Sequence, residues 1–233
     1  LNIPITPNLG AADVVSLTAE LTLNAQTTSR RQIIVNQWNY KAVGVGYREQ
    51  LQNRPAYLTD VAQKCTYACA LAIDTYLAGK FQSLTAGNVG TQGNALTDDV
   101  MLTAVENMNI ADIEATGRSF TLDPESVTDL FKIDKVVHDD YVAKGAMESP
   151  TGFIGRSRYG GLVYMSNNLK VQNTSYHSAG FYHKEAIAII IQKKNITDLF
   201  DWPQKFTQVV RAQVIFGAGI MRPTAGVCIN TRS

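Results

Sequence analysis

The residues that most suggest chemistry lie in the stretch TGFIGRSRYGGLVYM, residues 151–165, which contains four glycines and two arginines. A phosphate-cradling loop needs Lys and then Ser or Thr after its last glycine, followed by a helix whose N-terminus faces the anion. Here Arg156 and Arg158 stand in place of a lysine, and the apolar run over 161–165 is typical of a strand. The stretch therefore predicts a tight turn into a strand, and not a nucleotide-binding site.

The remaining glycine pairs and the histidines complete no catalytic site. Gly44 with Gly46, and Gly217 with Gly219, lack the third glycine of a dinucleotide-binding fingerprint. The histidines His138 and His183 each have carboxylates nearby, but hydrolysis would also need a nucleophile or a metal, and no pattern supplies either. We therefore predict no enzyme activity and no cofactor. An enzyme with a divergent site at one of these two histidines is the alternative.

Composition and cysteine content argue against further classes of function. The net charge is +1, whereas broad nucleic-acid binding usually comes with a strong basic excess. Cys65 and Cys69 share a predicted helix face and, with Cys228, make an odd number that argues against a disulfide framework. Structural zinc takes four ligands, so we expect buried thiols, no metal and a reducing compartment. No apolar run approaches the roughly 20 residues of a membrane span, which predicts no membrane partner.

The N-terminal part of the chain predicts strands. Apolar and polar residues alternate over 1–6 and again over 15–23, a period of two that indicates strands with one buried face. A third strand is expected over 33–47. Trp38 and Tyr40 share one face of it, and the later apolar residues have the opposite parity, which predicts a bulge or a region covered on both faces.

These strands are expected to form an extended arm, because few other residues precede the first long helix. An isolated two-stranded hairpin is marginally stable in water, and this arm carries aromatic and aliphatic side chains that need a surface to lie on. A neighbouring subunit would supply that surface, which predicts assembly. The alternative, that the strands pair within the subunit's own sheet, stays open.

The rest of the chain predicts helices and strands in mixed order. Residues 56–77 have the apolar spacing of a long amphipathic helix, with Gly79 placed to end it. A second helix is expected over 97–108, and the Asp-Pro pair that opens 123–131 signals a third. This order predicts an α+β fold. Strands are expected at 119–122, 161–165, 185–191, 206–216 and 220–229.

Several segments resemble one protein family in the same order along the chain. The run QVVRAQVIFGAGIMRPTAGVCINT, with Arg211 early and Arg222 before the proline, resembles the final strand pair of the major capsid proteins of tailed double-stranded DNA bacteriophages, which have the Hong Kong 97-type fold. The region 38–77 resembles the extended loop and long spine helix of that family, so the resemblance covers nearly the whole chain. The other matching segments are ATGRSFTLDPESVTDLF, TGFIGRSRYGGLVYMSNNL and SAGFYHKEAIAIII.

The resemblance implies an extended loop (1–47), a peripheral domain (48–83 and 194–233) and an axial domain (84–193). It also implies hexamers and pentamers that close an icosahedral head around a double-stranded DNA genome, in a virion assembled in the cytoplasm of a host bacterium. Portal, scaffolding and decoration proteins are the implied partners, and the packaged DNA would lie close by without specific contacts. A second reading of the same fold is an encapsulin-type nanocompartment, whose shell encloses an enzyme cargo.

Six residues are candidates for contacts between subunits. Two are aromatic residues of the arm, and four are arginines in the segments that resemble the family. Arg118 and Arg211 are equally plausible as partners of groups within their own subunit, so both roles stay open for Arg118. The candidates are Trp38, Tyr40, Arg118, Arg156, Arg158 and Arg222.

Overall fold

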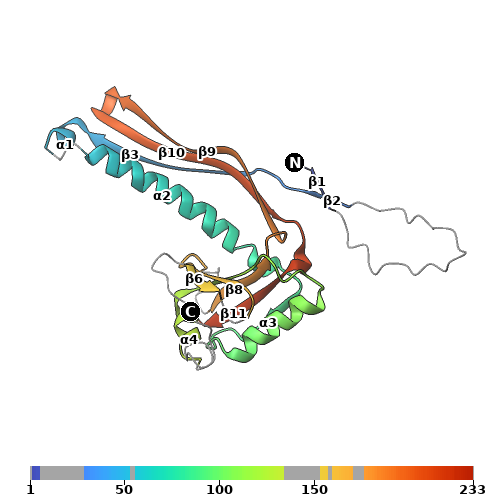
Figure 1. The fold of residues 1–233 in the computed structure, drawn as a ribbon. Helices are drawn as coiled ribbons and strands as arrows, with labels where there is room; N and C mark the ends of the chain where they lie inside the picture. Colours follow the sequence, from blue (N-terminus) through green and yellow to red (C-terminus); the bar gives the residue numbers. More distant parts are fainter. Residues whose placement is uncertain are drawn as a thin grey trace, which may run out of the picture.

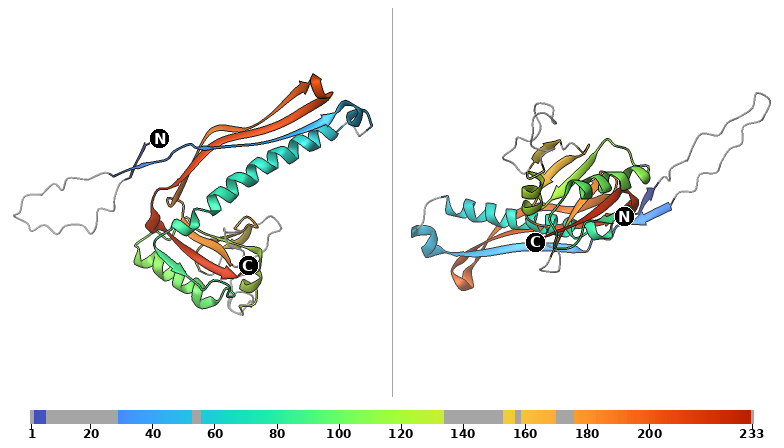
Figure 2. Two further views of the ribbon diagram at one scale, coloured as in Figure 1. Left: turned by 180° about the vertical axis from the view of Figure 1, so that it is seen from behind. Right: turned by 90° about the horizontal axis from the view of Figure 1, so that it is seen from below.

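The computed structural model describes residues 2–5, 29–52, 56–133, 153–156, 159–169 and 176–232 (Figure 1). A slender arm projects away from two larger sheets (Figures 1 and 2). In this arm β1 (Asn2–Ile5) pairs antiparallel with β2 (Ser29–Gln32), and within the described residues the two strands pair only with each other. The predicted strand over 15–23 lies outside the described residues.

A three-stranded antiparallel sheet follows the arm, in the order β3-β10-β9. The β3–β10 register runs without a shift from Gln37 opposite Phe216 to Gly46 opposite Thr207, so this ladder has no bulge, which was one of the two predicted explanations of the parity change. Residues 37–46 pair within their own chain, which is the alternative that the sequence left open for this part of the arm. The strands are β3 (Gln37–Gly46), β9 (Ile187–Trp202) and β10 (Thr207–Ile220).

The helix α2 (Tyr57–Ala78) runs along one face of this sheet, and the short helix α1 (Tyr47–Gln52) precedes it (Figure 1). The predicted helix is confirmed to within one residue at each end. Cys65 and Cys69 face the sheet and are each 1% exposed, as their spacing predicted, and burial raises the pKa of both thiols. Their small side chains let the helix approach β10 closely. The other buried residues of this core are Val45, Val61, Val210, Ala212, Val214 and Phe216.

The second sheet has six strands in the order β4-β11-β8-β5-β7-β6 and carries the larger core. Phe120 of β5 stacks on Phe181 of β8 with 3.9 Å between ring centroids, and neither side chain is exposed. The helix α3 (Asp98–Ile110) packs against β4 and β11. The strands are β4 (Gly87–Val89), β5 (Arg118–Leu122), β6 (Phe153–Arg156), β7 (Leu162–Met165), β8 (Tyr176–His183) and β11 (Gly226–Arg232).

The local start signals read from the sequence are confirmed. Thr97 caps α3, because its hydroxyl accepts a backbone N–H at 3.4 Å. Asp123 caps α4 (Pro124–Leu130) by accepting two backbone N–H groups, each at 3.1 Å. Gly160 has a φ of 79°, a left-handed conformation that suits glycine, and it turns the chain toward β7 as the glycine-rich stretch predicted.

Two predicted strands differ from the structure in their ends. β9 continues to Trp202, well beyond the strand predicted over 185–191, because it pairs with β10 along its length. The strand predicted over 220–229 is interrupted by the 3-10 turn Pro223–Ala225, since proline has no N–H to donate to a ladder. The chain therefore leaves one sheet at this turn and enters the other.

Membership of the two sheets differs from the predicted domain boundaries. β3, which lies in the extended loop predicted over 1–47, pairs in one sheet with β9 and β10. β9 begins before residue 194, and β11 lies in the six-stranded sheet with the strands of the predicted axial domain. The chain crosses between the sheets at 79–86, 184–186 and 221–225.

Candidate assembly surface

The three-stranded sheet has an open face opposite α2, and both aromatic candidates lie on it. Directly opposed residues of an antiparallel pair share a face, and the ladder sets Trp38 opposite Ile215 and Tyr40 opposite Gln213. Trp38 and Tyr40 are 68% and 69% exposed, so their rings face solvent and not the subunit's own core. Val45 of the same strand has the opposite parity and is buried against α2, which accounts for the parity change without a bulge.

A chain of polar contacts crosses the open face from β3 to β9. The Trp38 Nε1–H donates to Oε1 of Gln213 at 3.4 Å, and Nε2 of Gln213 donates to Oδ2 of Asp198 at 3.2 Å. Nη2 of Arg211 donates to the same Asp198 oxygen at 3.0 Å, and the guanidinium also lies 5.4 Å from the ring centre of Phe200. The hydrogen bond from Arg211 lowers the pKa of the Asp198 carboxyl. These contacts link the three strands on a face against which no helix of the described residues packs.

Further apolar side chains are exposed at the end of the sheet where β9 turns into β10. Phe206 adopts a φ of 48°, uncommon for a bulky residue, and is 74% exposed. The N–H of Tyr47 donates to the Phe206 carbonyl at 3.1 Å, which fastens this turn to α1. Exposed apolar groups gathered in this way are typical of an interaction surface. The exposed residues near this end are Tyr47, Leu51, Leu199, Phe200, Trp202 and Phe206.

Arg118 lies in the interior of the chain and is 5% exposed. Its Nε donates to the Glu114 carbonyl at 2.9 Å, Nη1 donates to Oδ1 of Asn109 at 2.8 Å, and Nη2 donates to the Ile113 carbonyl. Burial lowers the pKa of the guanidinium. This geometry fits the internal role that the sequence left open, because every donor atom is used to fix the loop between α3 and β5.

The described residues place no other arginine candidate on the face of the aromatic pair. Arg222 lies at the crossing between the sheets, where its Nη1 is 3.5 Å from Oε2 of Glu185. Arg156 is the last residue of β6, and Arg158 lies outside the described residues. Of the six candidates, only Trp38 and Tyr40 share a surface in the described part of the chain.

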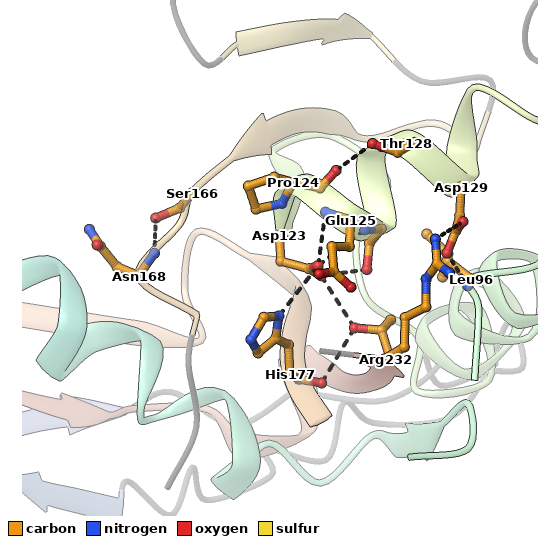
Figure 3. A network of polar contacts seen from close by, with 12 residues as sticks. Leu96, Asp123, Pro124, Glu125, Thr128, Asp129, Ser166, Asn168, His177 and Arg232 are labelled. Carbon is orange, nitrogen blue, oxygen red and sulfur yellow. Dashed lines mark hydrogen bonds and ion pairs between the residues drawn. The ribbon is translucent and has the colours of Figure 1, made fainter. Parts of the chain in front are cut away.

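A buried polar network that the sequence did not predict surrounds the start of α4 (Figure 3). Asp123 and Asp129 are 1% and 3% exposed. The hydroxyl of Thr231 donates to Asp123 at 3.2 Å, and Nδ1 of His177 lies 3.4 Å from the same carboxylate. Arg232 donates to Asp129 at 2.6 Å. The network fastens the end of β11 to α4, and its only sequence signal was the capping role of Asp123.

Of the two histidine alternatives for an enzyme site, the structure describes only His183, whose Nδ1 lies 4.0 Å from Oε2 of Glu185. His183 is 2% exposed; its Nε2 donates to the Thr116 carbonyl at 2.9 Å, and its Nδ1 accepts the Glu185 N–H at 3.4 Å. Both ring nitrogens therefore serve the turn after β8. His138 lies outside the described residues. Among the residues that the structure describes, no three His, Cys, Asp or Glu side chains gather as a metal site, and no helix is long and apolar enough to cross a membrane.

Comparisons with solved structures identify the arrangement. No family model and no curated protein matches the sequence. The chain is similar to a structure from Mycobacterium phage Che8, with a TM-score of 0.73 and 19% identity over 98% of this chain and 83% of that one. It is also similar to the capsid structure of Cyanophage P-SCSP1u, with a TM-score of 0.74 and 16% identity over 100% and 83% of the two chains. The capsid of a native GTA particle gives a TM-score of 0.65 and 13% identity over 100% and 85%.

Proposed function

We propose that this chain, which has the Hong Kong 97-type capsid fold, is a structural subunit of a protein shell. The observation that carries the proposal is the likeness to a phage capsid over 100% of the chain at a TM-score of 0.74. Two features support it independently. Trp38 and Tyr40 are 68% and 69% exposed on the open face, and the two strands of the projecting arm pair only with each other within the described residues. The role is structural, and no residue is assigned a catalytic part.

In its finer form, the proposal is a major capsid protein whose hexamers and pentamers close an icosahedral phage head around double-stranded DNA. A standard protein interface buries roughly 1,600 Å² in total, and modest contacts that are linked in one shell reinforce each other. The arm of a neighbouring subunit laid over the face of Trp38 and Tyr40 would supply such a contact. Arg156, Arg158 and Arg222 stay proposed contacts elsewhere. Portal, scaffolding and decoration proteins would bind the shell, and the chain would belong to a virion assembled in the cytoplasm of a host bacterium.

We also propose that the chain divides along its two sheets. Residues 1–36 would form the arm. The peripheral part would contain β3, α2, β9 and β10, and the axial part would contain the six-stranded sheet with α3 and α4. This division is favoured because the peripheral part and the axial part then each have their own hydrophobic core.

Electron microscopy and sedimentation of the expressed chain test the shell proposal. Closed particles of megadalton mass are expected. A discrete monomer or small oligomer at every concentration would contradict the proposal and favour the enzyme alternative. The contents of particles purified as they occur naturally separate the two shell readings, because DNA favours a phage head and a protein cargo favours an encapsulin-type nanocompartment.

A further inference from the structure

The glycine pair Gly217 and Gly219 of β10, which makes no nucleotide fingerprint, lies against the base of the arm. A β-carbon added to Gly217 would meet the Ile34 carbonyl oxygen and lie 2.8 Å from the Val35 Cα. Both atoms belong to the backbone, so no side-chain rotation could relieve the contact. A β-carbon on Gly219 would lie 3.2 Å from Cγ1 of Ile33. The chain at 33–35 therefore crosses β10 at a distance that position 217 allows only to glycine.

The side chain of Ile33 is buried at this crossing. Ile33 is 2% exposed, whereas the neighbouring Ile34 is 66% exposed, so one side chain enters the subunit and the next points to solvent. Residues 33–36 belong to no strand and separate β2 from β3. Since β1 and β2 pair only with each other in the described part of the chain, no ladder fixes the arm to the larger sheets. In the described part of the chain, the contact at 33–35 lies where the arm in Figures 1 and 2 joins the larger sheets.

We propose that Gly217 and Gly219 form a seat for residues 33–35, and that the seated Ile33 sets the direction in which the arm leaves the subunit. The two glycines are positioning residues, because they act through the arm and touch no partner. A seated arm reaches a neighbour with its base already ordered, which lowers the entropy lost at the contact. This use of the seat rests on the proposed shell function, whereas the seat itself is a property of the single chain.

Gly44 offers a matched control in the same sheet. A β-carbon there would have its nearest neighbours 3.9 Å away, in the side chain of Thr207, which is an ordinary van der Waals distance. Gly44→Ala and Gly217→Ala therefore add the same methyl group to neighbouring strands. Only the second variant conflicts with the base of the arm.

Pulsed electron spin resonance between a label on the arm and a label on the sheet tests the seat. Suitable positions are Gln32→Cys on β2 and Gln204→Cys in the turn after β9, both exposed, while the native thiols are buried. Labelled chain is diluted with unlabelled chain, so that only distances within one subunit are measured, whether or not shells form. The wild type and Gly44→Ala are expected to give the same narrow distance distribution. Gly217→Ala is expected to shift or broaden it, because the arm must move off β10.

A second variant keeps the test decisive if Gly217→Ala does not fold. Ile33→Ala empties the seat without adding an atom, and it is expected to broaden the same distribution. An unchanged distribution in a folded Gly217→Ala or Ile33→Ala chain overturns the seat. Electron microscopy of the same samples tests shell assembly separately. Gly217→Ala and Ile33→Ala are expected to form fewer or less regular shells than Gly44→Ala. If the wild type forms no shell, the proposed function fails, and the measured distances still decide whether the seat exists.

Discussion

The two sheets of this molecule bury their residues in different ways. In the six-stranded sheet, the first six of the seven residues of β11 are buried. In the three-stranded sheet, β9 contains sixteen residues and not one of them is fully buried. In the described part of the chain, the six-stranded sheet carries the larger core, whereas the three-stranded sheet packs one face against α2 and exposes Trp38 and Tyr40 on the other. One part of the chain therefore buries most of a strand in its own core, whereas the other contains a long strand that is nowhere fully buried.

The largest effect on stability is expected from Phe120→Ala, which removes a ring from the core of the six-stranded sheet. Phe120 is fully buried and stacked on Phe181. Its truncation should lower the free energy of unfolding by about 3–5 kcal/mol. The control is Phe206→Ala, since that ring is 74% exposed in the three-stranded part, and its truncation should change stability by no more than about 0.5 kcal/mol. Denaturant unfolding measures both, and equal losses would remove the contrast between the two parts.

A smaller loss is expected from Arg118→Ala. The change leaves the Asn109 side chain and two carbonyl groups without their donor near α3. Unsatisfied buried acceptors of this kind cost about 1–3 kcal/mol in the free energy of unfolding. Arg118→Lys keeps the charge but can replace only part of the donor set, so an intermediate loss is expected. If Arg118→Ala instead has normal stability but fails to assemble, Arg118 acts as a contact between subunits.

Trp38→Ala is expected to separate assembly from stability. The ring is 68% exposed, so the free energy of unfolding should change by less than about 1 kcal/mol. If a neighbour covers the open face, the concentration needed for assembly should rise at least about tenfold, the equivalent of about 1.4 kcal/mol. Tyr67→Ala is the matched control, because Tyr67 is 69% exposed on α2. Light scattering measures assembly, and the same response from both variants would show that the open face is not special.

Features set by neighbouring residues were predictable from the sequence. Asp123 before Pro124 and the spacing of Cys65 and Cys69 each depend on contacts within one or two helical turns, and each was read correctly. The shared face of Trp38 and Tyr40 follows from the period of two in a strand, and it was also predicted. Local features of this kind can be predicted directly from residue type and spacing.

Features that join distant parts of the chain were not predictable in the same way. Tyr40 lies opposite Gln213, and Arg232 donates to Asp129. The residues next to Tyr40 or Arg232 in the sequence do not indicate these distant partners. The sequence therefore left open whether the strands of the arm pair within the subunit's own sheet, and it did not indicate β10 as the partner of β3. The glycines of β10 show the same limit, because their spacing excluded a nucleotide fingerprint but did not reveal that residues 33–35 cross there.

The smallest effect is expected from the ion pair on the open face. Arg211 holds the pKa of Asp198 below its usual value of 3.8. A carboxyl whose pKa is lower in the folded chain stabilises that chain above its unfolded pKa, and the contribution is lost as the pH falls through the folded pKa. The free energy of unfolding of the wild type should therefore fall slightly below about pH 4, as Asp198 becomes protonated. Asp198→Asn lacks this contribution at every pH, so it should already be slightly less stable at neutral pH. Denaturant unfolding from about pH 3 to pH 6 measures the difference between the two curves.

Solvent and salt screen this pair in a single subunit, because the face is open. A neighbouring subunit that covers the face would exclude water and strengthen the interaction between Arg211 and Asp198. The pH-dependent difference between wild type and Asp198→Asn should then be larger, and less sensitive to added salt, for the dissociation of shells than for the unfolding of single subunits. An equal difference in both measurements would mean that assembly leaves this face exposed, and the three-stranded sheet would then have to meet its neighbours through its end and its edges.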